Sequence, residues 1–392
     1  MKINKCFTII DYGSKKIRLS TFNKNHEKIY STFENQNSNE SEEKKSDKIN
    51  QIIRRAEKKV SEHIEEILVL YDDHKILSID LSIKKEFDQK IIINENILLF
   101  IKEAKNILQN HHDNLKIIHT ITNKFLIDDK EYHQSLDKKL QGKKIIIDFK
   151  FICIPNEKYL FIEDLFKKNS VQVLKFFCTS ITKAIAYQKY FTNKKSIAFL
   201  DIGWERSTLT YFANNQIQYF KSIRVGGNHI TKDINKIFNV KMDQSEKIKH
   251  AFNSSKEEFS YDTINKQKNL LIRNIIGKDI DLDNLKMVIL ARVQEIIDLS
   301  LVENKLINKF KVSNGTVLIL TGDGSKIFNK NYFYLEDSFN FAEINYYNET
   351  DEEICSAGKE LFYSKSYEFE ENNNKNFKNK GFFERFFNLF GR

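Results

Sequence analysis

The chain has little of the two residues that interrupt helices and strands most often. Its 392 residues include 12 glycines and one proline, where average usage gives roughly 27 and roughly 20. This scarcity excludes collagen-like, linker-like and proline-rich disordered classes. It also predicts that each remaining glycine lies where a side chain does not fit.

Cysteines and long apolar runs are scarce too. The four cysteines are scattered, at Cys6, Cys153, Cys178 and Cys355. Because no two of them form a Cys-x-x-Cys pair, the sequence indicates neither a zinc site nor a disulfide framework. The N-terminus has no signal-peptide apolar core, and no apolar run reaches the roughly 18 residues that a membrane-spanning helix needs. A reducing, cytoplasmic compartment is therefore expected.

The charge balance is basic, with a formal net charge of +9. Such a balance can indicate an anionic partner, either nucleic acid or membrane. General enrichment in Lys, Asn, Ile and Phe is the alternative explanation. No arginine-rich block or basic–aromatic binding motif occurs, so we expect no nucleic-acid partner.

One pattern occurs twice in the chain. It consists of two apolar residues, Asp-x-Gly, five further residues, and Leu-[Ser/Thr]-x-Phe, and it begins at Ile9 and again at Phe199. Each copy is typical of a strand, a tight turn and a second strand. The repetition predicts a duplicated domain with a cleft between its halves.

The repeated turn suits phosphate binding. Its glycine permits a tight backbone turn whose N–H groups form an anion-binding concavity. In the first copy, Ser14 adds a hydroxyl group and Lys16 a positive charge, and Asp11 is useful if a hydrated Mg²⁺ lies between it and the phosphate. Two facing turns would hold a triphosphate from both sides. The alternative is an ordinary hairpin in which Asp is a turn residue.

Other segments have recognisable periodicity. Apolar spacing from Ile49 predicts an amphipathic helix with Ser46 as its N-cap, preceded by a loop or irregular hairpin over 24–48. A helix is expected at 93–110, with strands at 116–127 and 143–154. Residues 229–310 are expected to be mostly helical. A buried strand at 315–324 ends in a glycine turn that suits packing against a nucleobase or ribose.

These elements together resemble the actin–Hsp70–hexokinase ATPase superfamily and, within it, the cell division proteins of the FtsA family. Residues 9–22 resemble the first phosphate motif, 196–212 the second, and 318–327 the adenosine motif. The stretches most typical of FtsA are 223–234, with the following 245–249, and 288–301. The resemblance covers nearly the whole chain.

The resemblance implies a two-lobed actin-like α/β fold, that is, a duplicated RNase H-like fold, with an FtsA-type inserted small α/β domain and a C-terminal amphipathic helix. The boundaries it predicts are 1–75 and 156–195 for subdomain 1A, 76–155 for the inserted subdomain 1C, 196–228 and 313–363 for subdomain 2A, 229–312 for subdomain 2B, 364–380 for a disordered linker, and 381–392 for the membrane-targeting helix.

The resemblance also implies an ATP site with Mg²⁺. Asp11 and Asp201 would hold the metal through water, and Glu246 and Lys249 would face the ribose or base, with a surface ion pair as the alternative. The residues expected to bind the nucleotide are Asp11, Gly13, Ser14, Lys16, Asp201, Gly203, Arg206, Ser207, Gly226, Glu246, Lys249, Gly322, Gly324 and Ser325.

The second phosphate motif departs from the family pattern, which is usually Asp-x-Gly-Gly-Gly-Thr-Thr-Asp. Trp204 and Glu205 stand where two glycines are usual, and Thr208 replaces the final Asp. Bulky side chains restrict close approach of the backbone, and Glu205 adds negative charge, which Arg206 offsets in part. We predict ATP binding with weak or no hydrolysis, hence no productive enzyme. A scaffold without nucleotide is the alternative.

The last residues form a separate pattern. On a helix, an apolar arc of roughly 160° is formed by Phe382, Phe383, Phe386, Phe387, Leu389 and Phe390. Basic residues flank it at Lys378, Lys380 and Arg385, after a polar stretch over 364–380. An aromatic face with a basic flank predicts an interfacial helix on anionic lipid. Docking of this helix on the protein's own core is the alternative.

By resemblance, the protein would tether FtsZ polymers to the cytoplasmic face of the bacterial inner membrane at the division septum, as a peripheral membrane protein of the divisome. It would also recruit later division proteins and associate with itself. The helical domain over 229–310 would contact FtsZ and the polymer, and 76–155 would carry recruitment and self-association. The alternatives are a PilM-like pilus-assembly adaptor, which would not need the tail, and an actin-fold ATPase or kinase with active turnover.

Overall fold

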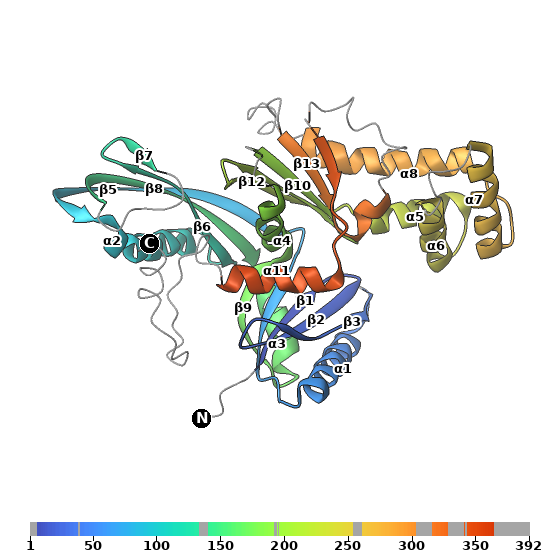
Figure 1. Ribbon diagram of the computed structural model, residues 1–392, viewed down its shortest axis with the longest axis horizontal. Coiled ribbons are helices and arrows are strands. Elements are labelled where there is room, and N and C mark those ends of the chain that lie inside the picture. The colour runs from blue at the N-terminus through green and yellow to red at the C-terminus, as the bar shows by residue number, and fades with distance from the viewer. Residues whose placement is uncertain are drawn as a thin grey trace. The chain divides into compact units, whose positions relative to one another are not determined.

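The computed structural model describes residues 6–37, 40–132, 140–191, 194, 196–253, 261–302, 316–327, 341 and 343–363. The chain divides into two compact units. Unit 1 consists of Met1–Lys189, Gln216–Gln218 and Asp351–Arg392, and unit 2 of Tyr190–Asn215 and Tyr219–Thr350. Figure 1 labels their helices and strands.

Unit 1 is built on a five-stranded sheet in the order β3-β2-β1-β4-β9. The strands are β1 (Cys6–Tyr12), β2 (Lys16–Asn23), β3 (Lys28–Asn35), β4 (Glu66–Tyr71) and β9 (Gln172–Cys178). Strand β1 is antiparallel to β2 and parallel to β4, and β4 is parallel to β9. The carboxyl ends of β1, β4 and β9 therefore meet at one edge of the sheet.

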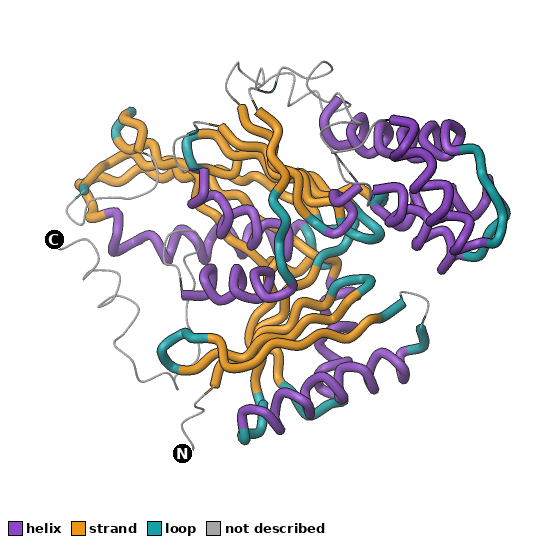
Figure 2. Tube along the Cα trace, turned by 45° about the vertical axis from the view of Figure 1, so that its right-hand side comes forward, coloured by secondary structure: helices purple, strands orange, loops and turns teal. Residues whose placement is uncertain are grey.

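Helices cover both faces of this sheet, α1 (Glu42–Val60) on one and α11 (Asp351–Tyr363) on the other (Figures 1 and 2). Gly358 of α11 packs so closely on Leu70 and Ile9 that a Cβ at this position would lie 2.9 Å from a Leu70 methyl carbon. Two further helices, α3 (Asn156–Lys167) and α4 (Thr179–Gln188), flank β9 in the sequence. A short 3₁₀-helix, η1 (Lys189–Phe191), follows α4.

Helix α1 begins earlier than its apolar spacing indicated. Its N-cap is Ser41, whose side chain accepts a hydrogen bond from the Lys44 backbone N–H, so the prediction of Ser46 as N-cap is wrong. The first turn carries Glu42 and Glu43, which the positive end of the helix dipole favours and which extend the helix beyond its apolar stripe. Within the segment 24–48, predicted as a loop or irregular hairpin, residues 28–35 form strand β3, which pairs antiparallel with β2.

A second, four-stranded sheet of unit 1 has the order β5-β8-β6-β7. Its strands are β5 (Leu77–Ile92), β6 (Leu115–Ile127), β7 (Lys130–Tyr132) and β8 (Gln141–Pro155). Helix α2 (Ile93–His111) contributes Ile97, Phe100 and Ala104 to a shared core with Phe149 and Phe151 of β8. The helix expected at 93–110 and the strands expected at 116–127 and 143–154 are confirmed.

Unit 2 is built on a sheet in the order β12-β11-β10-β13-β14. Its strands are β10 (Ser196–Ile202), β11 (Ser207–Ala213), β12 (Gln216–Ile223, whose first three residues are counted in unit 1), β13 (Thr316–Thr321) and β14 (Glu343–Tyr346). Its helices are α5 (Gly227–Phe238), α6 (Met242–Asn253), α7 (Tyr261–Ile276), α8 (Leu282–Ile297), the π-helical η2 (Asp298–Val302) and the 3₁₀-helical η3 (Asp323–Ile327). The helical character expected for 229–310 is confirmed over the described part of that segment.

The two five-stranded sheets repeat one topology. In each, an antiparallel hairpin precedes parallel pairing of its first strand with a later strand. The hairpins share the same register, because Asp11 pairs with Arg18 and Asp201 pairs with Thr208, seven residues on in both cases. The internal repeat expected from the sequence is therefore a repeat of structure.

The predicted linker over 364–380 and the predicted helix over 381–392, with all its apolar and basic residues, lie outside the described residues. Among the described helices, none combines the length and the apolar character that crossing a membrane requires.

Candidate functional site

The first Asp-x-Gly turn joins β1 to β2 in unit 1. The Gly13 N–H donates a hydrogen bond to the Lys16 carbonyl oxygen at 3.0 Å, and a Cβ on Gly13 would lie 2.9 Å from that oxygen. Real Cβ atoms do not approach a backbone oxygen so closely, so the turn requires glycine here. Ser14 follows in the same turn and is half-buried.

Asp11 lies at the end of β1 and is 3% exposed. One carboxylate oxygen accepts a hydrogen bond from Arg18 Nη1 at 2.9 Å, and the other accepts one from Thr179 Oγ1, at the start of α4, at 3.0 Å. Burial raises the pKa of Asp11, while the charges of Arg18 and Lys183 and the bond from Thr179 oppose that rise. Both oxygens of Asp11 are thus engaged within unit 1.

Asp351, the first residue of α11, continues this network. It accepts hydrogen bonds from Arg18 Nε at 2.5 Å and from Lys16 Nζ at 3.1 Å. Burial acts to raise the pKa of Asp351, but the hydrogen bonds and charges of Arg18 and Lys16 outweigh it and hold that pKa below its ordinary value. Lys16, predicted as a phosphate ligand, therefore contacts a carboxylate of its own chain.

The second Asp-x-Gly turn joins β10 to β11 in unit 2 and has the same backbone bond. The Gly203 N–H donates to the Arg206 carbonyl oxygen at 2.9 Å. The carbonyl oxygens of Gly203 and Trp204 in turn accept hydrogen bonds from the first N–H groups of α5, those of Gly227 at 2.9 Å and Asn228 at 2.7 Å. The turn and the N-terminus of α5 are therefore joined backbone to backbone.

Glycines make this junction possible. A Cβ on Gly226 would lie 2.7 Å from both the Arg206 nitrogen and the Gly203 oxygen. Gly322 and Gly324, after β13, approach Ile202 from another side, where a Cβ would lie 2.5 Å and 2.8 Å from its carbonyl oxygen, respectively. Three loops far apart in the sequence thus meet in unit 2 where side chains do not fit, as the glycine scarcity predicted.

Two predicted ligands in unit 2 hold this junction together through their hydroxyl groups. Ser207 Oγ donates to the Val225 carbonyl oxygen at 2.7 Å, and Ser325 Oγ donates to the Gly322 carbonyl oxygen at 2.7 Å. Both serines are buried. These serines therefore stabilise the loops of the phosphate and adenosine motifs, whether or not they also contact a ligand.

Glu246 and Lys249 lie on α6 and face the same junction. Lys249 Nζ is 2.6 Å from Glu246 Oε2, and it donates to the Gly227 carbonyl oxygen at 3.1 Å and to Thr231 Oγ1 at 2.9 Å. It also lies 4.9 Å from the centre of the Trp204 ring. The ion pair of the alternative is therefore present, but it is buried, because Lys249 is only 7% exposed.

The structure groups the predicted residues by unit. Asp11, Gly13, Ser14 and Lys16 surround the first turn, and the others surround the second. Sequence reasoning missed Arg18, Thr179 and Asp351 in the first network. Arg18 lies within the first phosphate motif, opposite Asp11 in the hairpin, whereas nothing local to Thr179 or Asp351 indicates contact with the turn.

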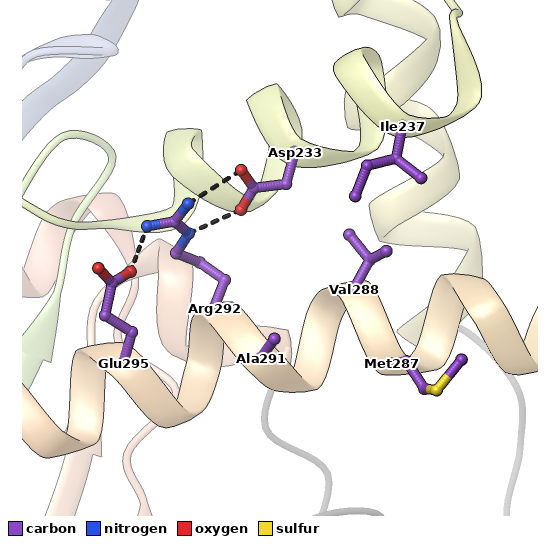
Figure 3. Close-up of a pocket in the computed structure, with 7 residues that line it drawn as sticks. All are labelled: Asp233, Ile237, Met287, Val288, Ala291, Arg292 and Glu295. Carbon is purple, nitrogen blue, oxygen red and sulfur yellow. Dashed lines mark hydrogen bonds and ion pairs between the residues drawn. The ribbon is translucent and has the colours of Figure 1, made fainter.

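A shallow hollow of about 520 Å³ lies between α5 and α8 in unit 2 (Figure 3). Arg292 of α8 donates to both carboxylate oxygens of Asp233 on α5, at 2.6 Å and 2.9 Å, and also bonds Glu295. At the other end of the hollow the apolar side chains of Ile237 and Met287 are 53% and 63% exposed. The hollow thus combines a charged end with an apolar end.

Two sheets of one topology, each with an Asp-x-Gly turn after its first strand, define an actin-like α/β fold. A solved structure titled "PilM-PilN type IV pilus biogenesis complex" has this fold, with a TM-score of 0.55 and 12% identity, covering 91% of this chain and 95% of that chain. At such low identity the likeness shows the fold alone.

Residues 198–332 match the family model described as "Cell division protein FtsA". Curated relatives with that name from Helicobacter pylori strains 26695 and J99 are each 23% identical over 133 residues, which is 34% of this chain and 27% of the relative. The matches thus span about a quarter of the length of these relatives. The resemblance to the FtsA family is confirmed over this region, which contains the second turn and helices α5 to α8.

Proposed function

We propose that this chain is an FtsA-type adaptor that links FtsZ polymers to the membrane at the site of cell division. The observation that carries the proposal is the match to the FtsA family over 198–332, within a chain whose fold is actin-like. The proposal includes recruitment of later division proteins and self-association, which we assign to residues 76–155. We assign contacts with FtsZ and with the polymer to the helical segment 229–310. The location that follows is peripheral, on the cytoplasmic face of the inner membrane at the septum.

We propose that the chain binds ATP and hydrolyses it weakly or not at all. Its ligands would be the residues predicted from the phosphate and adenosine motifs. For Mg²⁺ we keep Asp11 and Asp201, which would hold the metal through water. Asp11 also accepts hydrogen bonds from Arg18 and Thr179, one on each carboxylate oxygen, which leaves each oxygen a further lone pair.

The hollow between α5 and α8 is our candidate surface for FtsZ. It lies within the segment matched to the FtsA family, and exposed Ile237 and Met287 offer apolar contact beside the Asp233–Arg292 pair. Apolar anchors flanked by charge are typical of small docking surfaces.

Charged substitutions in the hollow test this assignment. Ile237→Asp combined with Met287→Asp should weaken FtsZ binding in solution at least tenfold, because a carboxylate would have to be desolvated against the partner. Leu270→Asp is the matched control, since Leu270 of α7 is 61% exposed in the same unit but does not line the hollow. Equal affinity of the double variant and the control would reject the hollow as the FtsZ surface.

The membrane contact of the proposal belongs to the predicted helix over 381–392. Its apolar arc and basic flank suit adsorption to anionic lipid, where both apolar burial and charge attraction contribute. A PilM-like adaptor remains the second candidate, because the PilM–PilN structure has the same fold over 91% of this chain. Failure to bind FtsZ would favour that candidate, and rapid ATP turnover would favour an ATPase or kinase.

A further inference from the structure

The chain's single tryptophan lies in the second Asp-x-Gly turn. Trp204 follows Gly203, whereas the equivalent position of the first turn, after Gly13, is occupied by Ser14. The backbone bond that closes each turn is the same, from the glycine N–H to the carbonyl oxygen three residues on. The two turns thus share the same closing backbone bond, but one carries a small polar side chain and the other a large aromatic ring.

The Trp204 ring covers a buried cation. Lys249 Nζ lies 4.9 Å from the ring centre, within the range at which an aromatic face attracts an ammonium group. The same ammonium group contacts the Gly227 carbonyl oxygen, Thr231 Oγ1 and the carboxylate of Glu246. Three groups of the protein thus accept hydrogen bonds or charge from this ammonium group, and the Trp204 ring covers its remaining side.

The backbone donors beside the ring are also occupied. The N-terminus of a helix ordinarily offers free N–H groups to an anion. In α5, the Gly227 and Asn228 N–H groups donate to the carbonyl oxygens of Gly203 and Trp204, and the Gly226 N–H donates to His229 Nδ1 at 3.2 Å. An anion reaching this junction finds both Lys249 and the helix N-terminus already in use.

We propose that Trp204 is a built-in cover of the second turn, which keeps a nucleoside triphosphate away from the turn and from Lys249 until the ring swings aside. This inference rests on the proposed binding of ATP and names what regulates it in this chain. The ring competes with the ligand, so the apparent affinity equals the affinity of the uncovered turn multiplied by the fraction of molecules in which the ring is displaced. If the ring is displaced in about a tenth of the molecules, the apparent Kd is about tenfold weaker than that of the uncovered turn.

Replacement of the ring tests the cover by binding. Trp204→Ser gives the second turn the residue of the first, and it should tighten the equilibrium binding of ATP, measured by calorimetry on the full chain, by about tenfold. Trp204→Phe is the matched control, because it retains an aromatic face, and it should change the affinity less than threefold. Equal or weaker binding by Trp204→Ser than by the wild type would overturn the cover.

The outcomes separate the cover from the proposed function. If wild type and Trp204→Ser bind ATP equally, the cover is wrong while ATP binding stands. If neither binds ATP, the nucleotide part of the proposed function fails and the cover fails with it, while the adaptor role is still decided by FtsZ binding.

Intrinsic fluorescence provides a second readout, because all tryptophan emission comes from Trp204. Saturating ATP should shift the emission of the wild type to longer wavelength and increase its quenching by acrylamide, as the ring leaves Lys249 for solvent. Lys249→Met should produce part of that change without ATP, by removing the cation under the ring. Unchanged emission and quenching at a concentration of ATP shown by calorimetry to saturate the protein would overturn the cover.

Discussion

At the scale of single residues, two glycines show how crowding and backbone conformation differ. Gly322 and Gly277 both have positive φ angles, of 90° and 73°. A Cβ on Gly322 would lie 2.4 Å from Asp201 Oδ1 and 2.5 Å from the Ile202 carbonyl oxygen, whereas a Cβ on Gly277 meets nothing within 4 Å. Gly322 is therefore required because its neighbours leave no room for a side chain, whereas Gly277 is favoured only because its φ angle is positive.

Alanine at the two positions should separate these effects. Gly277→Ala should lower the free energy of unfolding by about 1 kcal/mol, the usual cost of a left-handed conformation for a side chain. Gly322→Ala should cost about 3 kcal/mol or more, because the backbone of the junction must also move. Urea unfolding of both variants measures the difference, and equal losses would contradict the crowding seen at Gly322.

Asp351 gives a prediction that depends on pH. Although burial acts to raise its pKa, Arg18 and Lys16 hold that pKa below the ordinary value. A carboxyl group with a depressed folded pKa stabilises the protein above its unfolded pKa, about 4, and loses this contribution as the pH falls through the folded value. Wild type should therefore be more stable than Asp351→Asn near pH 6, and the gap in Tm should narrow as the pH falls below about 4. A constant gap would contradict an ionised Asp351 in this network.

The residue scale also shows what the sequence could predict of the site. Gly13, Gly203, Gly226, Gly322 and Gly324 were predictable because a local turn pattern carries them. The partners of the turn residues were not, because Asp351 lies 340 positions after Asp11 and no local pattern links the two. The contact between Trp204 and Lys249 was equally hidden, since it depends on how α6 packs beside the second turn.

At the scale of elements, Arg292 joins α8 to α5. Its guanidinium group bonds both oxygens of Asp233 and also reaches Glu295 on its own helix (Figure 3). Paired hydrogen bonds from one arginine to one carboxylate are stronger and more directional than ordinary surface ion pairs. This contact fixes the charged end of the hollow.

Removal of this arginine should loosen the helix pair. Arg292→Ala should lower the free energy of unfolding by about 1–2 kcal/mol, since the side chain is partly exposed and solvent screens the pair. Arg273→Ala is the matched control, because Arg273 is more exposed and lies 4.0 Å from Asp279, and it should change stability by less than about 0.5 kcal/mol. Chemical denaturation of the two variants gives the comparison, and a loss no larger for Arg292→Ala would show that the contact contributes little.

Most elements were predictable from periodicity, and their ends were not. The helix at 93–110 and the strands of the two hairpins have clear apolar periodicity, so local sequence was enough to predict them. Strand β3 lies in a polar segment whose pairing with β2 decides its conformation, and local composition does not show that partner. Helix α1 starts at Glu42 because Ser41 caps it, five residues before the serine that its apolar stripe favoured.

At the scale of the whole molecule, duplication is the organising feature. Both five-stranded sheets have the same strand order, and both hairpins have the same register around an Asp-x-Gly turn. The copies have since diverged in chemistry. In the first, Arg18 and Asp351 form a charged network, and in the second, glycine loops and Trp204 close on Lys249. Side chains of the same chain contact both turns. This is consistent with the proposed adaptor, which binds nucleotide without rapid turnover.

The most direct test of the adaptor role is co-pelleting of FtsZ polymers with vesicles that contain anionic lipid. The full chain should carry FtsZ into the vesicle pellet, and the chain without residues 381–392 should leave it in the supernatant. Vesicles of neutral lipid should recover less FtsZ, because the basic flank of the tail loses its attraction. FtsZ that stays in the supernatant with the full chain, or pellets equally with the shortened one, would contradict the proposed tether.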